Sequence, residues 1–85
     1  MNKPTTTRAK AVTVVTTISQ TTGEARYRVW HRVYSRLQLL YGVNLNAHPR
    51  QAGESLISVA ERFGYIEELY AVVLAEWIFS EAVEA

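Results

Sequence analysis

The chain has 85 residues, which leaves room for one hydrophobic core and none for a second domain. It contains no cysteine, and this excludes a disulfide framework and a thiolate zinc site and fits a reducing cytoplasm. The net charge is only +1, yet residues 1–50 carry eight basic side chains against one acidic one, and residues 51–85 carry one against seven. This split indicates either a basic surface for phosphates or two halves that attract each other.

Residues 1–7 are polar and lack an apolar anchor, so we expect a flexible N-terminal arm before a single helical domain at residues 8–85. Residues 9–20 are ambiguous, because their valines and threonines favour a strand whereas the spacing of three apolar residues favours a helix. We expect a helix, and a strand is the alternative. The helical spacing is carried by Ala11, Val15 and Ile18.

Residues 21–24 read Thr-Thr-Gly-Glu, a capping-box pattern that predicts the start of a second helix. A stripe at three- and four-residue steps then predicts its buried face. The stripe consists of Tyr27, Trp30, Val33, Tyr34, Leu37, Leu40 and Tyr41. Gly42 follows where a left-handed residue is expected to end the helix, and Val43 can add the accompanying apolar contact.

A third helix is expected from Pro49 to about residue 63, because proline suits the first helical position. Gly53 weakens its first turns, so the start can slip toward Ser55. The predicted buried face of this helix is Leu56, Val59, Ala60 and Phe63. The pattern as a whole predicts an all-α fold, a small bundle of three to four helices.

The last helix is expected at residues 66–83, after Gly64, and it is apolar on most of its circumference. Glu76 interrupts the apolar run, which is also too short to cross a membrane, so we expect a soluble, cytoplasmic protein. A helix apolar on nearly all sides is expected to pack on its own core and on a second subunit. The predicted interface of this homodimer or higher oligomer is Leu69, Tyr70, Val73, Leu74, Trp77 and Ile78.

The composition argues against catalysis and against a metal or other cofactor. There is no aspartate and no cysteine, and no nucleophile with a base and an orienting acid suggests itself. His31 and His48 lie in unrelated contexts, so a metal site would need distant glutamates as further ligands. The four glycines are isolated and form no phosphate-binding loop.

The basic helix at residues 26–36 is the strongest functional feature of the sequence. Its candidate binding residues for nucleic acid or another partner are Arg26, Arg28, His31, Arg32 and Arg36. Arginines on a firm helix can neutralise several phosphates, and such binding weakens as salt rises. The alternative is that these arginines are solvated or pair with glutamates of the last helix. The neighbouring aromatic residues can stack on bases, although their helical spacing favours a role in the core.

A broader likeness covers about residues 9–60. The apolar run at residues 11–18 is followed by Tyr-Arg-Val-Trp at 27–30, by Tyr34 and Leu37, and by Tyr-Gly-Val at 41–43. This order resembles the C-terminal domain of phage antirepressor-type regulatory proteins. The resemblance implies a phage or prophage regulator of the kind usually attached to a separate DNA-binding domain, and no segment of the 85 residues corresponds to that domain.

The sequence therefore predicts a small phage regulatory protein that takes part in transcription regulation as an oligomer and contacts DNA through its basic helix. The alternative is a protein–protein interaction module or inhibitor whose basic face meets an acidic host or phage protein. A third interpretation makes the oppositely charged halves a device for assembly. No small-molecule substrate is expected.

Overall fold

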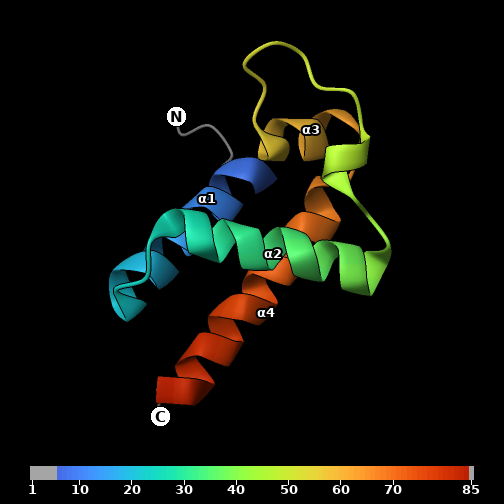
Figure 1. The fold of residues 1–85 in the computed structure, drawn as a ribbon. Helices are drawn as coiled ribbons and strands as arrows, with labels where there is room; N and C mark the ends of the chain where they lie inside the picture. Colours follow the sequence, from blue (N-terminus) through green and yellow to red (C-terminus); the bar gives the residue numbers. More distant parts are fainter. Residues whose placement is uncertain (1–5, 85) are drawn as a thin grey trace, which may run out of the picture.

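The structure is a computed structural model that describes residues 6–84, with side chains described as far as residue 80. The regular elements that it describes are all helices, and a loop without a helix joins η1 to α3 (Figure 1). They are α1 (Thr7–Thr22), α2 (Arg26–Tyr41), the short 3₁₀ turn η1 (Leu45–Ala47), α3 (Leu56–Arg62) and α4 (Ile66–Glu84). The predicted all-α class is confirmed, and the strand alternative for residues 9–20 is wrong because α1 spans them.

The first helix begins within the segment expected to be a flexible arm. Thr6 is its N-cap, and the Thr6 hydroxyl accepts a hydrogen bond from the backbone N–H of Ala9. Thr6 and Thr7 therefore belong to the folded domain, while residues 1–5 lie outside the described residues. The buried residues of α1 are the three that carried the helical spacing, Ala11, Val15 and Ile18.

The capping box predicted at residues 21–24 does not form, because Thr22 lies in the last turn of α1. Gly23 ends this helix with a φ of 76°, and its N–H donates to the carbonyl of Ser19. The second helix starts after Ala25, whose side chain makes no capping hydrogen bond. The left-handed backbone of Gly23 thus prevents the capping box, because a capping box would require helical backbone at this residue.

The second helix buries part of the predicted stripe, namely Val33 and Leu37, together with Val29, which was not predicted. Its fully buried residues are Val29, Val33 and Leu37. Tyr27, Leu40 and Tyr41 are 70%, 60% and 49% exposed, so their predicted burial is wrong. Val29 is buried in place of the neighbouring Trp30, about 100° away around the helix, and the aliphatic side chains of the buried stripe allow closer packing of helices. Trp30 and Tyr34 lie at its edge, partly buried, with their rings stacked.

Gly42 ends α2 as predicted, and Val43 packs against the core. Pro49 does not start a helix. Gly53 has a φ of 75°, which a helix cannot accommodate, so α3 begins only after its N-cap Ser55.

The loop before α3 is held by Arg62, which donates hydrogen bonds to the carboxylate of Glu54 and to the carbonyl of Pro49. The short helix itself buries Ile57, Val59 and Ala60. Phe63 was predicted to be buried but is 38% exposed, and its ring packs on His48 at 4.5 Å between centroids.

The core lies where α4 meets α1 and α2, and α2 crosses in front of α4 in Figure 1. The short helix α3 and η1 lie together at the end where α4 begins. In α4 the fully buried apolar residues are Leu69 and Val73, joined by the nearly buried Val72. No helix among the described residues has the length and apolar character needed to span a bilayer.

Candidate functional site: the exposed side of α2

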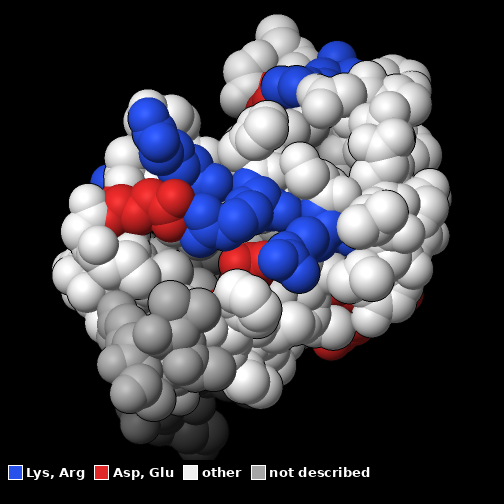
Figure 2. Space-filling view, turned by 60° about the horizontal axis from the view of Figure 1, so that its bottom comes forward, with Lys and Arg blue, Asp and Glu red and all other residues white. Residues whose placement is uncertain are grey.

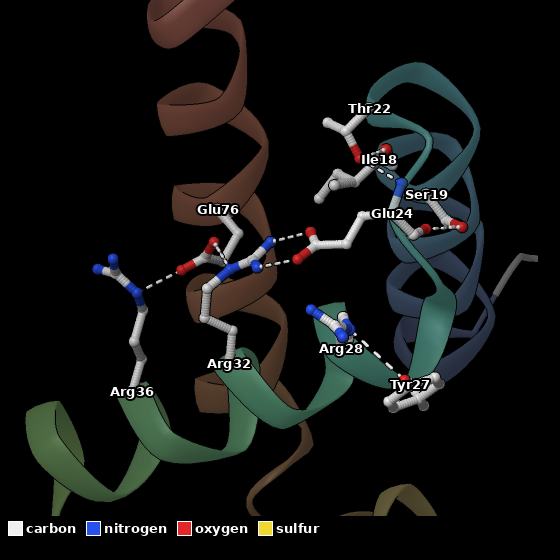
Figure 3. A network of polar contacts seen from close by, with 9 residues as sticks. All are labelled: Ile18, Ser19, Thr22, Glu24, Tyr27, Arg28, Arg32, Arg36 and Glu76. Atoms are coloured by element: carbon white, nitrogen blue, oxygen red, sulfur yellow. Dashed lines mark hydrogen bonds and ion pairs between the residues drawn. The ribbon is translucent and has the colours of Figure 1, made fainter.

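The structure divides the five residues predicted to bind a partner into two groups. Arg26, Arg28 and His31 are exposed, whereas Arg32 and Arg36 are partly covered and turn toward α4 (Figure 3). The arginines at 28, 32 and 36 form a row because residues four apart lie on one side of a helix. The row therefore has fewer free charges than expected, because Arg32 and Arg36 have partners within the chain.

Arg32 uses its whole guanidinium on two carboxylates. Its two terminal nitrogens donate to the two oxygens of Glu24 at 2.7 and 2.8 Å, and its Nε donates to Glu76 Oε2 at 3.1 Å. The paired contact with Glu24 has the bidentate geometry in which arginine binds carboxylates most strongly. These hydrogen bonds lower the pKa of Glu24 and raise that of Arg32.

Glu76 is the buried end of this network. Its side chain is only 4% exposed, and it projects from α4 toward α2. Arg36 forms a second ion pair with it through Nε, and the Arg36 guanidinium also lies over the ring of Phe79. A buried carboxylate is costly unless countercharges accompany it, so Arg32 and Arg36 are needed by the fold itself.

A positive surface is left on the exposed side of α2. Figure 2 shows the Lys and Arg side chains as a continuous band with acidic side chains against it. The helix carries four arginines, and two of them pair with the carboxylates of Glu24 and Glu76, which leaves two positive charges in excess. Arg28 donates a hydrogen bond from Nε to the Tyr27 hydroxyl at 3.4 Å, and its positive charge also helps to lower the pKa of Glu24. Arg26 and Arg28 therefore carry the charge available to a partner.

Three hollows border this side of α2, and His31 lines each of them. The first, of about 600 Å³, is lined by Arg28 and Arg32 together with Glu24, and it is called the cationic hollow here. The second, of about 470 Å³, lies among aromatic and aliphatic side chains and is called the aromatic hollow. The third, of about 270 Å³, is bordered by side-chain amides and is called the amide hollow. A partner on α2 would meet charge, apolar surface and amides within one area.

The floor of the aromatic hollow is formed by the stacked rings of Trp30 and Tyr34, 5.5 Å apart between centroids. Burial raises the pKa of Tyr34 to about 12, and the positive charges of Arg50 and Arg8 oppose part of this rise. Both arginines therefore contribute to the potential felt at this hydroxyl. Tyr34 stays neutral and able to donate a hydrogen bond at physiological pH.

The predicted interface residues of α4 also fall into groups that differ in burial. Leu69 and Val73 are fully buried in the chain's own core, so neither lies on a surface. Tyr70 and Trp77 are partly buried against that core. Leu74 and Ile78 are 37% and 65% exposed.

Sequence reasoning missed the two alanines that lie beside these exposed residues. Ala71 and Ala75 are exposed on the same side of α4 as Leu74 and Ile78, and together they form its free face. The signal was available in the spacing, since residues 71, 74, 75 and 78 share one side of a helix. The free face was missed because the prediction did not separate these residues from the apolar residues on the opposite side of α4.

Within the described residues, no cluster of three or more histidine, aspartate or glutamate side chains is arranged to hold a metal ion. Comparison of the chain with family models, with curated proteins and with solved structures finds no match. The function therefore has to be argued from the geometry of this surface.

Proposed function

We propose that this chain is a protein-binding module that receives an acidic partner protein on the exposed side of α2 and performs no catalysis. The observation that carries the proposal is the place of Arg28, which is exposed and lines the cationic hollow together with Tyr27, while Arg26 is exposed at the first residue of α2. Charge at the rim with aromatic surface beside it is the composition that protein interfaces favour. Tyr27 is 70% exposed and supplies such an aromatic contact.

An acidic protein is preferred over nucleic acid because of the carboxylates within the arginine row. Glu24 keeps 27% of its side chain exposed next to Arg32, and a phosphate backbone placed there would be repelled. A protein partner can place a carboxylate opposite Arg28 and another opposite Arg26 at the start of α2, and avoid Glu24. Its apolar side chains can then occupy the hollow beside them.

Nucleic acid is the second candidate, and the continuous positive band in Figure 2 favours it. The excess of two positive charges on α2 supports few phosphate contacts, so the affinity would be modest and strongly dependent on salt. A role as a small phage regulator, expected from the resemblance, is compatible with either partner.

The two candidates are separated by anisotropy titrations of labelled ligands at low ionic strength and at about 0.15 M salt. The ligands are an acidic peptide containing leucine and phenylalanine, a polyglutamate peptide of equal charge, and a short DNA duplex. We expect the mixed peptide to bind most tightly at the higher salt. Tighter binding of the duplex there would replace the first candidate with the second, and no saturable binding of any ligand would contradict both.

The site is tested with the double variant Arg26→Ala/Arg28→Ala. Both residues are exposed, so the fold should persist, and we expect affinity for the mixed peptide to fall by about tenfold or more. Lys10→Glu is the control, because it also lowers the net charge by two and Lys10 is exposed on α1. Equal losses in the two variants would show that the peptide senses only overall charge.

We also propose that two copies of the chain associate through the free face of α4. In an antiparallel pair centred between residues 74 and 75, Leu74 lies opposite Ala75, and Ala71 lies opposite Ile78. Each large side chain then meets a small one, which lets the helices approach closely. No charged residue falls between Ala71 and Ile78 on this face.

A further inference from the structure

The aromatic and amide hollows adjoin, because His31, Tyr34 and Leu56 line both of them. Together they form one groove, called here the α2 groove, between α2 and the segment that contains η1 and the start of α3. The groove runs from Tyr27 near the start of α2 to Gln38 near its end. The eleven helical rises between these residues correspond to about 17 Å, the length of about five residues of extended chain.

The two ends of the α2 groove differ in chemistry. The first end is apolar, with Val12 from α1 facing Tyr27 and Trp30 from α2. The second end carries the side-chain amides of Gln38, Asn44 and Asn46. Such amides can pair with the N–H and C=O groups of an extended peptide, whereas the backbone of a bound helix has already used its own groups.

Positive charge stands at both ends of the groove. At the apolar end, the Arg28 guanidinium lies 6.0 Å from the centre of the Tyr27 ring. At the amide end, Arg50 donates a 2.8 Å hydrogen bond to the side-chain oxygen of Asn46. None of the residues that line the two hollows is acidic. A ligand with carboxylates is thus attracted at either end and meets no like charge inside.

We propose that the α2 groove binds an extended acidic segment of a partner protein, with an aromatic or large aliphatic side chain seated between Val12, Tyr27 and Trp30. The segment's backbone pairs with the amides at the other end, and its carboxylates face Arg28 and Arg50. This inference rests on the proposed function and specifies where and in which conformation the acidic partner is held.

Val12→Glu tests the apolar end without altering an arginine. Val12 is 39% exposed on α1, where glutamate is a better helix former than valine, so the fold should persist. The probe is the labelled peptide of glutamate, leucine and phenylalanine used above, measured by anisotropy. We expect a loss of affinity of about tenfold or more, since the new carboxylate stands where the anchor would sit. The matched control is Thr13→Glu, which adds the same charge at an exposed position outside the groove lining.

Gln38→Ala tests the amide end, with Gln20→Ala as its control on α1. Both glutamines are exposed on helices, and alanine is favourable in a helix, so circular dichroism should show unchanged folding. We expect affinity to fall about threefold to tenfold in Gln38→Ala, as the loss of one hydrogen bond implies, and to stay unchanged in Gln20→Ala.

The results of these experiments distinguish a failure of the groove proposal from a failure of the proposed function. If the wild-type chain fails to bind the peptide, both are wrong. If it binds, and Arg26→Ala/Arg28→Ala weakens binding while Val12→Glu and Gln38→Ala do not, the arginine surface stands and the groove is refuted. Loss of binding in Thr13→Glu equal to that in Val12→Glu would also refute it, because charge alone would then explain the effect.

Discussion

Glu76 is the residue on which the charge arrangement of this protein depends. It is the buried carboxylate of α4, and Arg32 and Arg36 of α2 both form ion pairs with it. The alternative that arginines of the basic helix pair with glutamates of the last helix thus holds for these two. Sequence alone could not decide it, because burial of one glutamate among the seven in residues 51–85 depends on how α2 crosses α4.

Replacing Glu76 by glutamine should lower the free energy of unfolding by about 2 kcal/mol, because two arginines lose the buried carboxylate that they share. The loss stays below that of a fully buried pair, since Arg32 and Arg36 are 38% and 41% exposed and water can solvate them. Urea denaturation followed by circular dichroism measures the change.

Glu61→Gln is the matched control, since Glu61 pairs with Arg8 at 3.5 Å with both side chains exposed. Exposed pairs contribute about 0–1 kcal/mol, so this variant should be nearly neutral. An equally small effect in Glu76→Gln would show that the buried network contributes nothing to stability.

The lowered pKa of Glu54 predicts how the free energy of unfolding changes at acid pH. Hydrogen bonds from Arg62 and then from the backbone N–H of Gln51 lower its pKa from 4.5 to about 2. A lowered carboxyl pKa contributes stability that is present above the unfolded value and is lost as pH falls through the folded value. We expect the free energy of unfolding to decrease between pH 4.5 and 2, and to decrease less steeply in Glu54→Gln.

Urea unfolding of the wild type and of Glu54→Gln at several pH values tests this expectation. The comparison is made between slopes, because Glu24 also has a lowered pKa and adds its own acid dependence in both proteins. Identical slopes would refute the assignment of acid sensitivity to Glu54.

The helices themselves followed closely from apolar spacing and from glycine positions. Ala11, Val15 and Ile18 predicted the buried side of α1, and Gly42 predicted the end of α2. The buried stripe of α2 was predicted only in part, at Val33 and Leu37, because valines and aromatics one residue apart both satisfy the helical period. Which stripe faces inward depends on the neighbouring helices, and the smaller residues fit at their crossing.

The start of α2 is a weak point that a single substitution can strengthen. Ala25 occupies its N-cap with an extended backbone, φ −62° and ψ 142°, and offers no side-chain acceptor. Ala25→Ser should raise the free energy of unfolding by about 1 kcal/mol, since a hydroxyl can accept from the exposed N–H groups of the first turn. Thermal denaturation should show a higher midpoint.

The reverse change at α1 is the counterpart. Thr6→Ala removes the hydroxyl that accepts from the Ala9 N–H at 3.1 Å and should lower stability by about 1 kcal/mol. If both variants shift stability in the same direction, capping does not control these helix starts.

In the molecule as a whole, the positive charge of the basic helix α2 has two roles. Part of the positive charge of α2 binds Glu76 and joins the halves, and the remainder at Arg26 and Arg28 faces solvent. The sequence located the basic helix correctly, but it could not separate structural from free arginines. That separation follows from the packing of α2 on α4, which brings together residues 44 apart in the chain.

The α4 association is tested by light scattering coupled to size exclusion. We expect a mass near twice 9.6 kDa at micromolar concentration, and a monomer for Leu74→Glu, whose charge would be buried between the paired helices. Leu39→Glu is the control, as Leu39 is 80% exposed on α2 and lies outside the free face of α4. A monomeric wild type, or a dimer that survives Leu74→Glu, would contradict this interface.

Chemical-shift mapping of the ¹⁵N-labelled chain during titration with the acidic peptide tests the binding surface most directly. If the exposed side of α2 receives the partner, the amide shifts should cluster at Tyr27, Arg28 and His31 and around Asn44 and Asn46, with the free face of α4 unchanged. Shifts confined to α4, or no saturable shifts at about 0.15 M salt, would contradict the proposal.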